Sequence, residues 1–413
     1  MLAHPCHAQF VTVNNGSFER DGKPYYFVGT NFWYGPILAS EGEGGNRKRL
    51  KKELDLLKKT GINNLRILVG SDGIAGPRAK VRPTLQQAPG VYNDTILAGL
   101  DYLLAELGKR HMVAVLYLNN SWEWSGGYSF YLEHAGAGKA VIPEESGYDK
   151  YQEQVRQFAT NKRAQQLFFD YTRFIISRTN RYTGRKYVND PAIMSWQIGN
   201  EPRAFASELL PDFEKWLSEA SALIRSIDPN HLISIGSEGA FGCEGSYETW
   251  EHICSDKNID YCNIHLWPLN WGWTKKDSVL ESVERACNNA QDYIDRHLAI
   301  AAKINKPLVM EEFGYPRDNY KLGLGTPTVA RDKFYRYVFN LVYQNAKKHE
   351  PFSGLNFWGW GGYAKPKHER WVDGDDYSGD PAQEEQGLNS VFASDKSTLK
   401  IIKEYCGKLS KVK

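Results

Sequence analysis

The chain has 413 residues, of which 41% are hydrophobic and 24% charged, as is usual for a soluble globular protein. Its formal charge of +2 provides no electrostatic case for nucleic-acid binding, and we find no basic arm that would suggest one. No run of 18 apolar residues occurs, so we expect no membrane span. The length allows one large barrel or several smaller domains.

Aromatic residues are unusually frequent, with 12 Trp and 24 Tyr, many of them in glycine-rich segments. Aromatic side chains outside regular elements often form platforms for sugar rings, although a large barrel also buries many of them in its core. The composition is therefore compatible with a carbohydrate-binding protein.

The first nine residues precede a strand-like run and have no positive region or full apolar core. We interpret residues 1–9 as either the remnant of a signal peptide or a disordered start, and we expect a secreted or extracytoplasmic protein. Six cysteines are too few for a disulfide scaffold, and none has metal-site spacing. One disulfide among Cys243, Cys254, Cys262 and Cys287 is compatible with the sequence.

Strand-like and helical patterns alternate along the rest of the chain. Residues 10–20 contain two short strand-like runs around Asn14-Asn15-Gly16, which predicts a β-hairpin that plugs one end of the core. The predicted strands are 25–31, 62–69, 112–118, 192–198, 232–235, 261–264, 307–310 and 354–358. The predicted helices are 46–59, 96–109, 161–181, 208–226, 277–304, 328–348 and 395–409.

Eight apolar strands, mostly separated by helices, predict a parallel sheet. Because no break in composition divides them, we expect an α/β fold with a single (β/α)8 TIM barrel over residues 10–413. Long segments at 75–92, 125–151 and 361–386 each follow a strand. In such a barrel the loops after the strands build the active-site face.

Polar residues gather where the predicted strands end. These residues are Asn31, Arg66, Asn119, Asn200, Glu201, His265, Glu312 and Trp358. In a TIM barrel such positions converge on one face. Two carboxyls with amide, imidazole and guanidinium partners suit glycoside hydrolysis, in which one carboxyl is protonated and the other ionised.

These residues resemble those of clan A retaining glycosidases, specifically glycoside hydrolase family 5, over most of the chain. The motifs are Asn-Glu-Pro at 200–202 and Glu-Glu-Phe-Gly at 311–314, with Arg66, His265 and Trp358. Asn-Phe-Trp-Tyr-Gly at 31–35, Gln-Ile-Gly-Asn-Glu-Pro-Arg at 197–203 and Gln-Gly-Leu-Asn-Ser-Val-Phe at 386–392 are similar to the endo-β-1,4-mannanase subfamily.

The resemblance implies that Glu201 is the general acid/base and Glu312 the nucleophile. The family's nucleophile directly precedes an aromatic-glycine pair, which selects Glu312 over Glu311. Neighbouring strand residues point to opposite faces, so we also expect only one of the two to face the pocket. Arg66 would keep Glu312 ionised, and Asn200 would bind the substrate 2-hydroxyl.

For several of the remaining site residues, the sequence allows more than one role. His265 is either part of the pocket's hydrogen-bond network or a structural histidine. Arg203 resembles a residue that binds the leaving sugar, although it could form a capping ion pair instead. Trp358 would be the sugar platform at the cleavage point, with Trp360 as a rival. Trp33, Trp122 and Trp124 are candidate subsite aromatics.

One position departs from the family pattern. Many members have a tyrosine two residues after the histidine, hydrogen-bonded to the nucleophile, and this chain has Trp267 there. An indole donates a hydrogen bond but cannot accept one, so we expect a different local network.

The sequence therefore predicts a retaining endo-β-1,4-mannanase that acts on mannan, glucomannan or galactomannan and needs no metal or cofactor. An endo-β-1,4-glucanase on the same scaffold and a non-catalytic carbohydrate-binding barrel are the alternatives. The expected partner is a β-mannan polysaccharide or oligosaccharide.

Overall fold

The computed structural model describes residues 10–73 and 81–413, which contain one sheet of eight parallel strands. These strands are β4 (Phe27–Asn31), β5 (Asn64–Leu68), β8 (Val113–Tyr117), β9 (Ile193–Gln197), β10 (Leu232–Ser234), β11 (Cys262–Leu266), β12 (Leu308–Phe313) and β13 (Phe352–Phe357). The first of them in the chain, β4, pairs with the last, β13, and the order is β10-β9-β8-β5-β4-β13-β12-β11. The sheet is thus a barrel with one seam, between β10 and β11.

The seam is bridged without a regular ladder because β10 has only three residues. The backbone N–H of Asp260 donates to the carbonyl of Ile233 at 2.9 Å. The side-chain oxygen of Asn263 accepts from the backbone N–H groups of Ile235 and Gly236 at 3.1 and 2.8 Å. These bonds give partners to backbone groups at the seam, where β10 and β11 do not pair directly.

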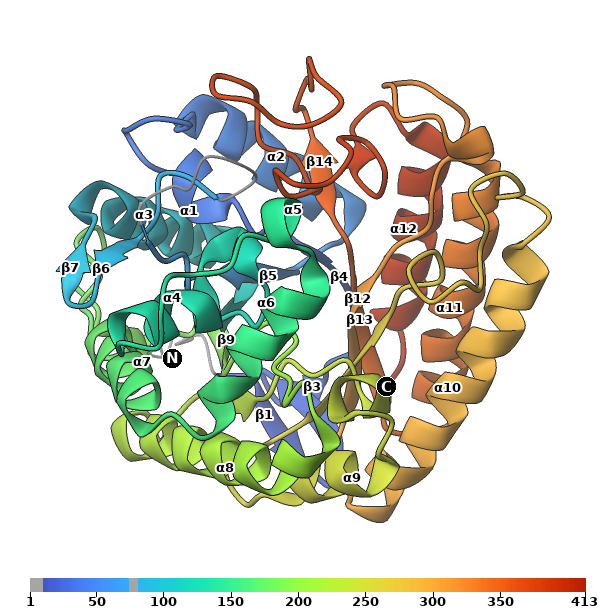
Figure 1. Ribbon diagram of the computed structural model, residues 1–413. Coiled ribbons are helices and arrows are strands. Elements are labelled where there is room, and N and C mark those ends of the chain that lie inside the picture. The colour runs from blue at the N-terminus through green and yellow to red at the C-terminus, as the bar shows by residue number, and fades with distance from the viewer. Residues whose placement is uncertain (1–9, 74–80) are drawn as a thin grey trace, which may run out of the picture.

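An outer helix follows each barrel strand, and the helices surround the sheet (Figure 1). They are α2 (Arg47–Thr60), α3 (Asp94–Lys109), α7 (Lys162–Ile176), α8 (Leu210–Ile227), α9 (Tyr247–Ser255), α10 (Val283–Lys303), α11 (Val329–Lys347) and α12 (Lys396–Leu409). The predicted start and end of α2 are confirmed, because the Asn46 side chain accepts from Arg49 N at 2.9 Å and Gly61 follows with φ of 97°. Of these eight outer helices, only α9 has no counterpart among the predicted helices.

The N-terminal hairpin is confirmed, with β1 (Thr12–Asn14) antiparallel to β2 (Ser17–Arg20), followed by β3 (Lys23–Pro24). Asn15 and Gly16 both have positive φ, at 48° and 74°, as a tight hairpin turn requires. Phe18 of β2 packs edge-on against Tyr261, with ring centres 5.2 Å apart. The hairpin therefore covers the N-terminal end of the barrel and leaves the opposite end to the site.

The long segments after the strands carry elements of their own. The predicted loop at 125–151 is largely helical, with η1 (Glu123–Ser125), α4 (Gly127–His134), α5 (Pro143–Ser146) and α6 (Tyr148–Val155). The segment after β13 contains β14 (Trp360–Gly362), which pairs with β15 (Val391–Phe392). The predicted loop at 75–92 lies partly outside the described residues, and its later part forms β6 (Gln86–Ala88) and β7 (Val91–Tyr92).

Other expectations have mixed outcomes. The possible disulfide is wrong for the described cysteines, since Cys243, Cys254, Cys262, Cys287 and Cys406 are all buried and unbridged. No helix in the described ranges has the length and apolar character needed to cross a membrane. The predicted signal-peptide remnant at 1–9 lies outside the described residues.

Candidate active site

Glu201 lies four residues beyond the end of β9, in an uncommon backbone conformation. Its φ is +49°, in the left-handed region that non-glycine residues rarely occupy. The loops on both sides hold it there: its N–H donates to Gly236 O at 2.9 Å, and Ser121 Oγ donates to its carbonyl at 2.5 Å. Such strain is typically retained at functional sites.

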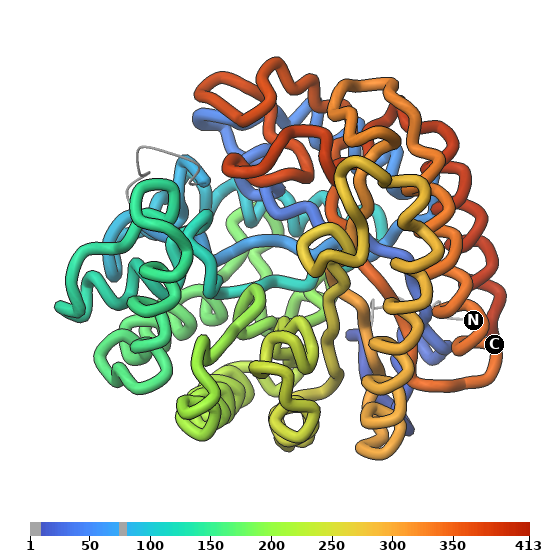
Figure 2. Tube along the Cα trace, turned by 45° about the vertical axis from the view of Figure 1, so that its right-hand side comes forward, coloured from blue at the N-terminus to red at the C-terminus, as the bar shows by residue number. Residues whose placement is uncertain are grey.

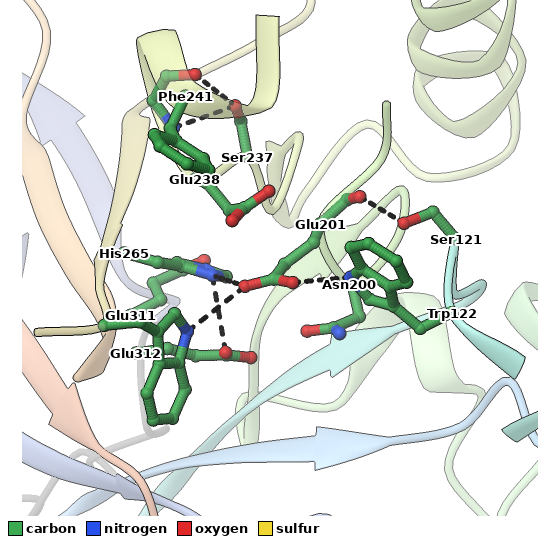
Figure 3. A network of polar contacts seen from close by, with 12 residues as sticks. Ser121, Trp122, Asn200, Glu201, Ser237, Glu238, Phe241, His265, Glu311 and Glu312 are labelled. Carbon is green, nitrogen blue, oxygen red and sulfur yellow. Dashed lines mark hydrogen bonds and ion pairs between the residues drawn. The ribbon is translucent and has the colours of Figure 1, made fainter. Parts of the chain in front are cut away.

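The Glu201 carboxyl is surrounded by nitrogen atoms (Figure 3). The indole N–H of Trp122 donates to Oε2 at 2.6 Å. His265 Nδ1 lies 2.8 Å from Oε1, and the indole N–H of Trp267 donates to the same oxygen at 3.3 Å. The expected difference at Trp267 thus takes a specific form, because the indole contacts the acid/base rather than the nucleophile.

Glu312 stands at the end of β12 and faces Glu201 across His265. Its Oε1 forms a very short contact with Arg66 Nη1, and its Oε2 lies 3.4 Å from His265 Nδ1. Burial lowers the pKa of His265 well below its ordinary value, and the charge of Arg66 lowers it further. The imidazole is therefore neutral; it hydrogen-bonds to Glu201 and lies beside Glu312.

The two carboxyls are close enough to influence each other. One ligand atom each from Glu201, His265 and Glu312 lie within 4.8 Å of one another. The pKa of Glu312 is raised well above its ordinary value, because burial and the charge of Glu201 raise it more than the charge of Arg66 lowers it. Burial also raises the pKa of Glu201, against the charge of Arg203 and the hydrogen bond from Trp122. The contact with Arg66 favours the charge on Glu312, which leaves the proton for Glu201.

Arg66 is fully buried and connects the strand ends. It donates from Nε to Gln197 Oε1 at 2.7 Å, from Nη1 to Asn31 Oδ1 at 3.1 Å, and from Nη2 to Asn200 Oδ1 at 3.0 Å. The predicted residues Asn31, Arg66, Asn200 and Glu312 are thus in one network. Within residues 10–73 and 81–413, Asn200 Nδ2 makes one hydrogen bond, to Asn120 at 3.2 Å, which leaves its second N–H for a substrate hydroxyl.

The expectation that strand alternation would separate Glu311 from Glu312 holds only in part. Glu312 lines the pocket, as expected, and Glu311 does not. Yet a register shift pairs Ile264 with Met310 and His265 with Glu312, so Glu311 is an extra residue in β12. Because a bulge redirects side chains, Glu311 also points inward, and its Oε2 lies 3.8 Å from Arg66 Nε.

Arg203 forms the ion pair that was the alternative to sugar binding. Its Nε and Nη2 donate to both oxygens of Glu238 at 2.5 and 2.7 Å. Its guanidinium also lies 5.2 Å from the Trp122 ring centre, and it lines the pocket. The sequence reasoning missed Glu238, although its position just after β10 could have indicated it.

The pocket above the carboxyls has a volume of about 880 Å³, and four of the candidate tryptophans line it. They are Trp122, Trp124, Trp267 and Trp358. Trp33 and Trp360 do not, so both are wrong as pocket aromatics. Trp33 is buried behind Trp124, with ring centres 5.7 Å apart, and donates to Gly379 O at 3.0 Å. Trp360 is completely buried in β14.

Segments far apart in the chain complete the pocket wall. The segment after β11 (gold) and that after β13 (red) come together (Figure 2), and residues of both line the pocket. Glu385, in the segment after β13, lies 3.9 Å from Lys276 Nζ in the segment after β11, and it accepts from Tyr320 OH, in the segment after β12, at 2.7 Å. Sequence reasoning missed these residues because nothing in the sequence shows how long loops fold.

Comparisons with known proteins agree with this geometry. The family model described as GH family 5 beta-mannosidase-like matches residues 8–413. The chain is 27% identical to a putative mannan endo-1,4-beta-mannosidase 9 of Oryza sativa subsp. japonica, covering 99% of this chain and 91% of the relative.

Solved structures are similar as well. A glycoside hydrolase family 5 mannosidase from Rhizomucor miehei is 33% identical with a TM-score of 0.89, covering 98% of both chains. A mutant of that enzyme in complex with mannosyl-fructose has a TM-score of 0.90. The endo-β-1,4-mannanase from Thermotoga petrophila shares the fold at 22% identity, with a TM-score of 0.70 over 95% of this chain and 78% of that one. This chain belongs to glycoside hydrolase family 5, in its β-mannosidase-like group.

Proposed function

We propose that the protein is a retaining endo-β-1,4-mannanase that cleaves mannan, glucomannan or galactomannan. The observation that carries the reaction type is the close approach of Glu201 and Glu312, whose nearest oxygens lie within 4.8 Å. Retaining enzymes hold their carboxyls roughly 5–5.5 Å apart, whereas inverting enzymes need about 6.5–9.5 Å to admit a water molecule. The curated relatives named as mannan endo-1,4-β-mannosidases support the substrate.

The reaction proceeds in two steps. Glu312 attacks the anomeric carbon while Glu201 gives its proton to the leaving oxygen, which forms a glycosyl-enzyme. Glu201, now a carboxylate, removes a proton from water, and the resulting attack releases Glu312. The N–H groups of Trp122 and Trp267 stabilise the Glu201 carboxylate between the two steps. Trp358 supplies the flat apolar surface on which the cleaved sugar stacks.

A second candidate function is that of an exo-acting β-mannosidase. Two observations favour it: the similarity to the Rhizomucor miehei mannosidase extends over 98% of both chains, and Lys276, Tyr320 and Glu385 join the loops after β11, β12 and β13 at one side of the pocket. A site closed at one side suits the end of a chain, whereas an endo-acting enzyme needs a cleft open at both sides.

Hydrolysis of mannohexaose, followed by chromatography, separates the two functions. An endo-acting enzyme first gives mannobiose, mannotriose and mannotetraose, and an exo-acting enzyme first gives mannose and mannopentaose. Galactomannan should be cleaved far faster than carboxymethylcellulose, and the reverse ranking would establish the glucanase alternative. Glu201→Gln and Glu312→Gln should each lose several orders of magnitude in rate while remaining folded. Normal turnover in either variant would contradict the assignment of that residue.

We also propose that the enzyme acts outside the cytoplasm, where a polymeric cell-wall or storage mannan would be accessible to it. Fractionation of the producing cells, with activity measured in medium and lysate, tests this. Activity confined to the lysate would contradict it.

A further inference from the structure

Glu311 is a buried carboxyl that the two-step reaction does not use. It is fully buried, and it occupies the bulge position of β12 directly before the nucleophile. In the described part of the chain, its carboxyl has three polar partners. Gln197 Nε2 donates to Oε2 at 2.5 Å, Tyr261 OH donates to Oε1 at 3.3 Å, and Arg66 Nε lies 3.8 Å from Oε2. Burial of a carboxyl group is unfavourable in free energy, so the presence of Glu311 here needs an explanation.

Arg66 therefore faces two carboxyls with a single positive charge. Its direct contact is with Glu312, whereas Glu311 lies farther away, at 3.8 Å from Nε, and Gln197 bridges the two by hydrogen bonds. Glu312 also lines the pocket, and Glu311 does not. In the free enzyme the geometry consequently favours an ionised Glu312 and a protonated Glu311. Burial raises the pKa of both carboxyls, that of Glu311 to about 7, so the direct contact with Arg66 is what places the charge on Glu312.

The surroundings of Glu311 can satisfy both protonation states. Tyr261 OH lies 2.7 Å from Ser195 Oγ, and either atom can be the donor. When Glu311 is ionised, Tyr261 donates to it, as in the structure. When Glu311 is protonated, its hydroxyl donates to Tyr261, and Tyr261 donates to Ser195 in turn. A change in the protonation of Glu311 therefore requires only that these hydroxyls rotate, and the backbone does not have to move.

Formation of the glycosyl-enzyme changes the charge beside Arg66, because Glu312 becomes a neutral ester. The other acceptors of Arg66 are neutral amides on Asn31, Gln197 and Asn200. A guanidinium cannot release its proton, and a buried charge without a counter-ion is strongly disfavoured. Glu311 lies 3.8 Å from Arg66, so its carboxylate can replace Glu312 as the counter-ion.

We propose that Glu311 is the reserve counter-ion of Arg66: it holds a proton while Glu312 is ionised and releases that proton to solvent when Glu312 is esterified. This rests on the proposed retaining mechanism. The bond between C1 and the leaving group breaks with its electron pair on the leaving group, and a Glu312 oxygen bonds to C1. The O–H bond of Glu311 breaks, its proton goes to water, and its carboxylate pairs with Arg66. Hydrolysis of the ester reverses the proton movement.

The test uses 2-deoxy-2-fluoro-β-mannosyl fluoride, which forms a long-lived glycosyl-enzyme and releases fluoride without a proton. The enzyme carries Glu201→Gln, so that the acid/base contributes no titrating proton. At about pH 6, one unit below the pKa of Glu311, intact-mass labelling should be accompanied by release of close to one proton per adduct, measured with an indicator dye in weak buffer. The infrared difference spectrum should lose one carboxylic-acid carbonyl band. The matched control Glu201→Gln/Glu311→Gln should label but release no proton and lose no such band.

The outcomes separate the two claims. Labelling without proton release, or equal release from both variants, would overturn the role of Glu311 while leaving the retaining mechanism intact. Failure to form any adduct would overturn the retaining mechanism and this proposal together. If the double variant does not fold, Tyr261→Phe in the Glu201→Gln background replaces it. The carboxylic-acid band should then shift, since the Glu311 hydroxyl has lost its acceptor, and an unshifted band would contradict the proposal.

Discussion

Substitution of Trp122 by phenylalanine should move the alkaline limit of activity. The indole N–H donates to Glu201 Oε2 at 2.6 Å, and this bond lowers the pKa of Glu201. Glu201 must be protonated in the first step, so activity falls as the pH rises through its pKa. Loss of a donor to the carboxylate raises that pKa, and the alkaline limb of kcat/KM should therefore move to higher pH.

The size of the shift follows from the hydrogen bond. A bond to a charged group contributes about 1.5–3 kcal/mol, and one pKa unit corresponds to about 1.4 kcal/mol. Because His265 and Trp267 also contact the carboxyl, we take the lower part of this range and expect a shift of about one pH unit. Trp267→Phe removes a longer bond of 3.3 Å and should give a smaller shift in the same direction.

The assay is the pH dependence of kcat/KM on an aryl β-mannoside, which reports the pKa values of the free enzyme. Trp124→Phe is the matched control, because Trp124 lines the same pocket without a hydrogen bond to Glu201. Its alkaline limb should stay in place. An unchanged limb in Trp122→Phe, or an equal shift in Trp124→Phe, would refute the reasoning.

Three further predictions concern stability and binding. Arg203→Met leaves the buried carboxylate of Glu238 unpaired and should cost about 3–5 kcal/mol in urea unfolding, most of which Glu238→Gln in the same chain should restore; an additive double variant would contradict the pairing. Trp358→Phe should raise KM for manno-oligosaccharides, because Trp358 lines the pocket. Trp33→Phe should lower the Tm and leave KM unchanged, because Trp33 is buried in the core. The opposite pattern would show that the two residues have been assigned the wrong way round. Asn46→Ala removes the cap of α2 and should cost about 1 kcal/mol of unfolding free energy with kinetics unchanged; an undiminished stability would show that the cap contributes nothing.

Much of the fold could be predicted because local patterns and tertiary structure agree. Near-continuous apolar runs specify buried parallel strands, and Asn46 and Gly61 mark the ends of a helix. The topology then dictates that residues at strand ends meet. This is why Arg66 and Glu312, 246 positions apart, could be placed together from the sequence.

The unpredicted parts depend on local backbone geometry that no periodicity records. A one-residue bulge turns Glu311 inward, where simple alternation separates it from Glu312. Trp33 and Trp360 lie near strand ends like Trp358, yet packing against the loops buries them away from the pocket. Arg203 could be recognised as a site residue, but its partner comes from the irregular seam of the barrel.

Chemical rescue by azide tests the central claim most directly, because it assigns both carboxyls at once. With an activated aryl β-mannoside, Glu201→Ala should form a glycosyl-enzyme on Glu312 that azide intercepts to give the β-mannosyl azide. Glu312→Ala should instead let azide enter the vacated nucleophile position and give the α-mannosyl azide. Product stereochemistry by proton NMR distinguishes them. An α-azide from Glu201→Ala, or no rescue of either variant, would contradict a double displacement with Glu312 as nucleophile and Glu201 as acid/base.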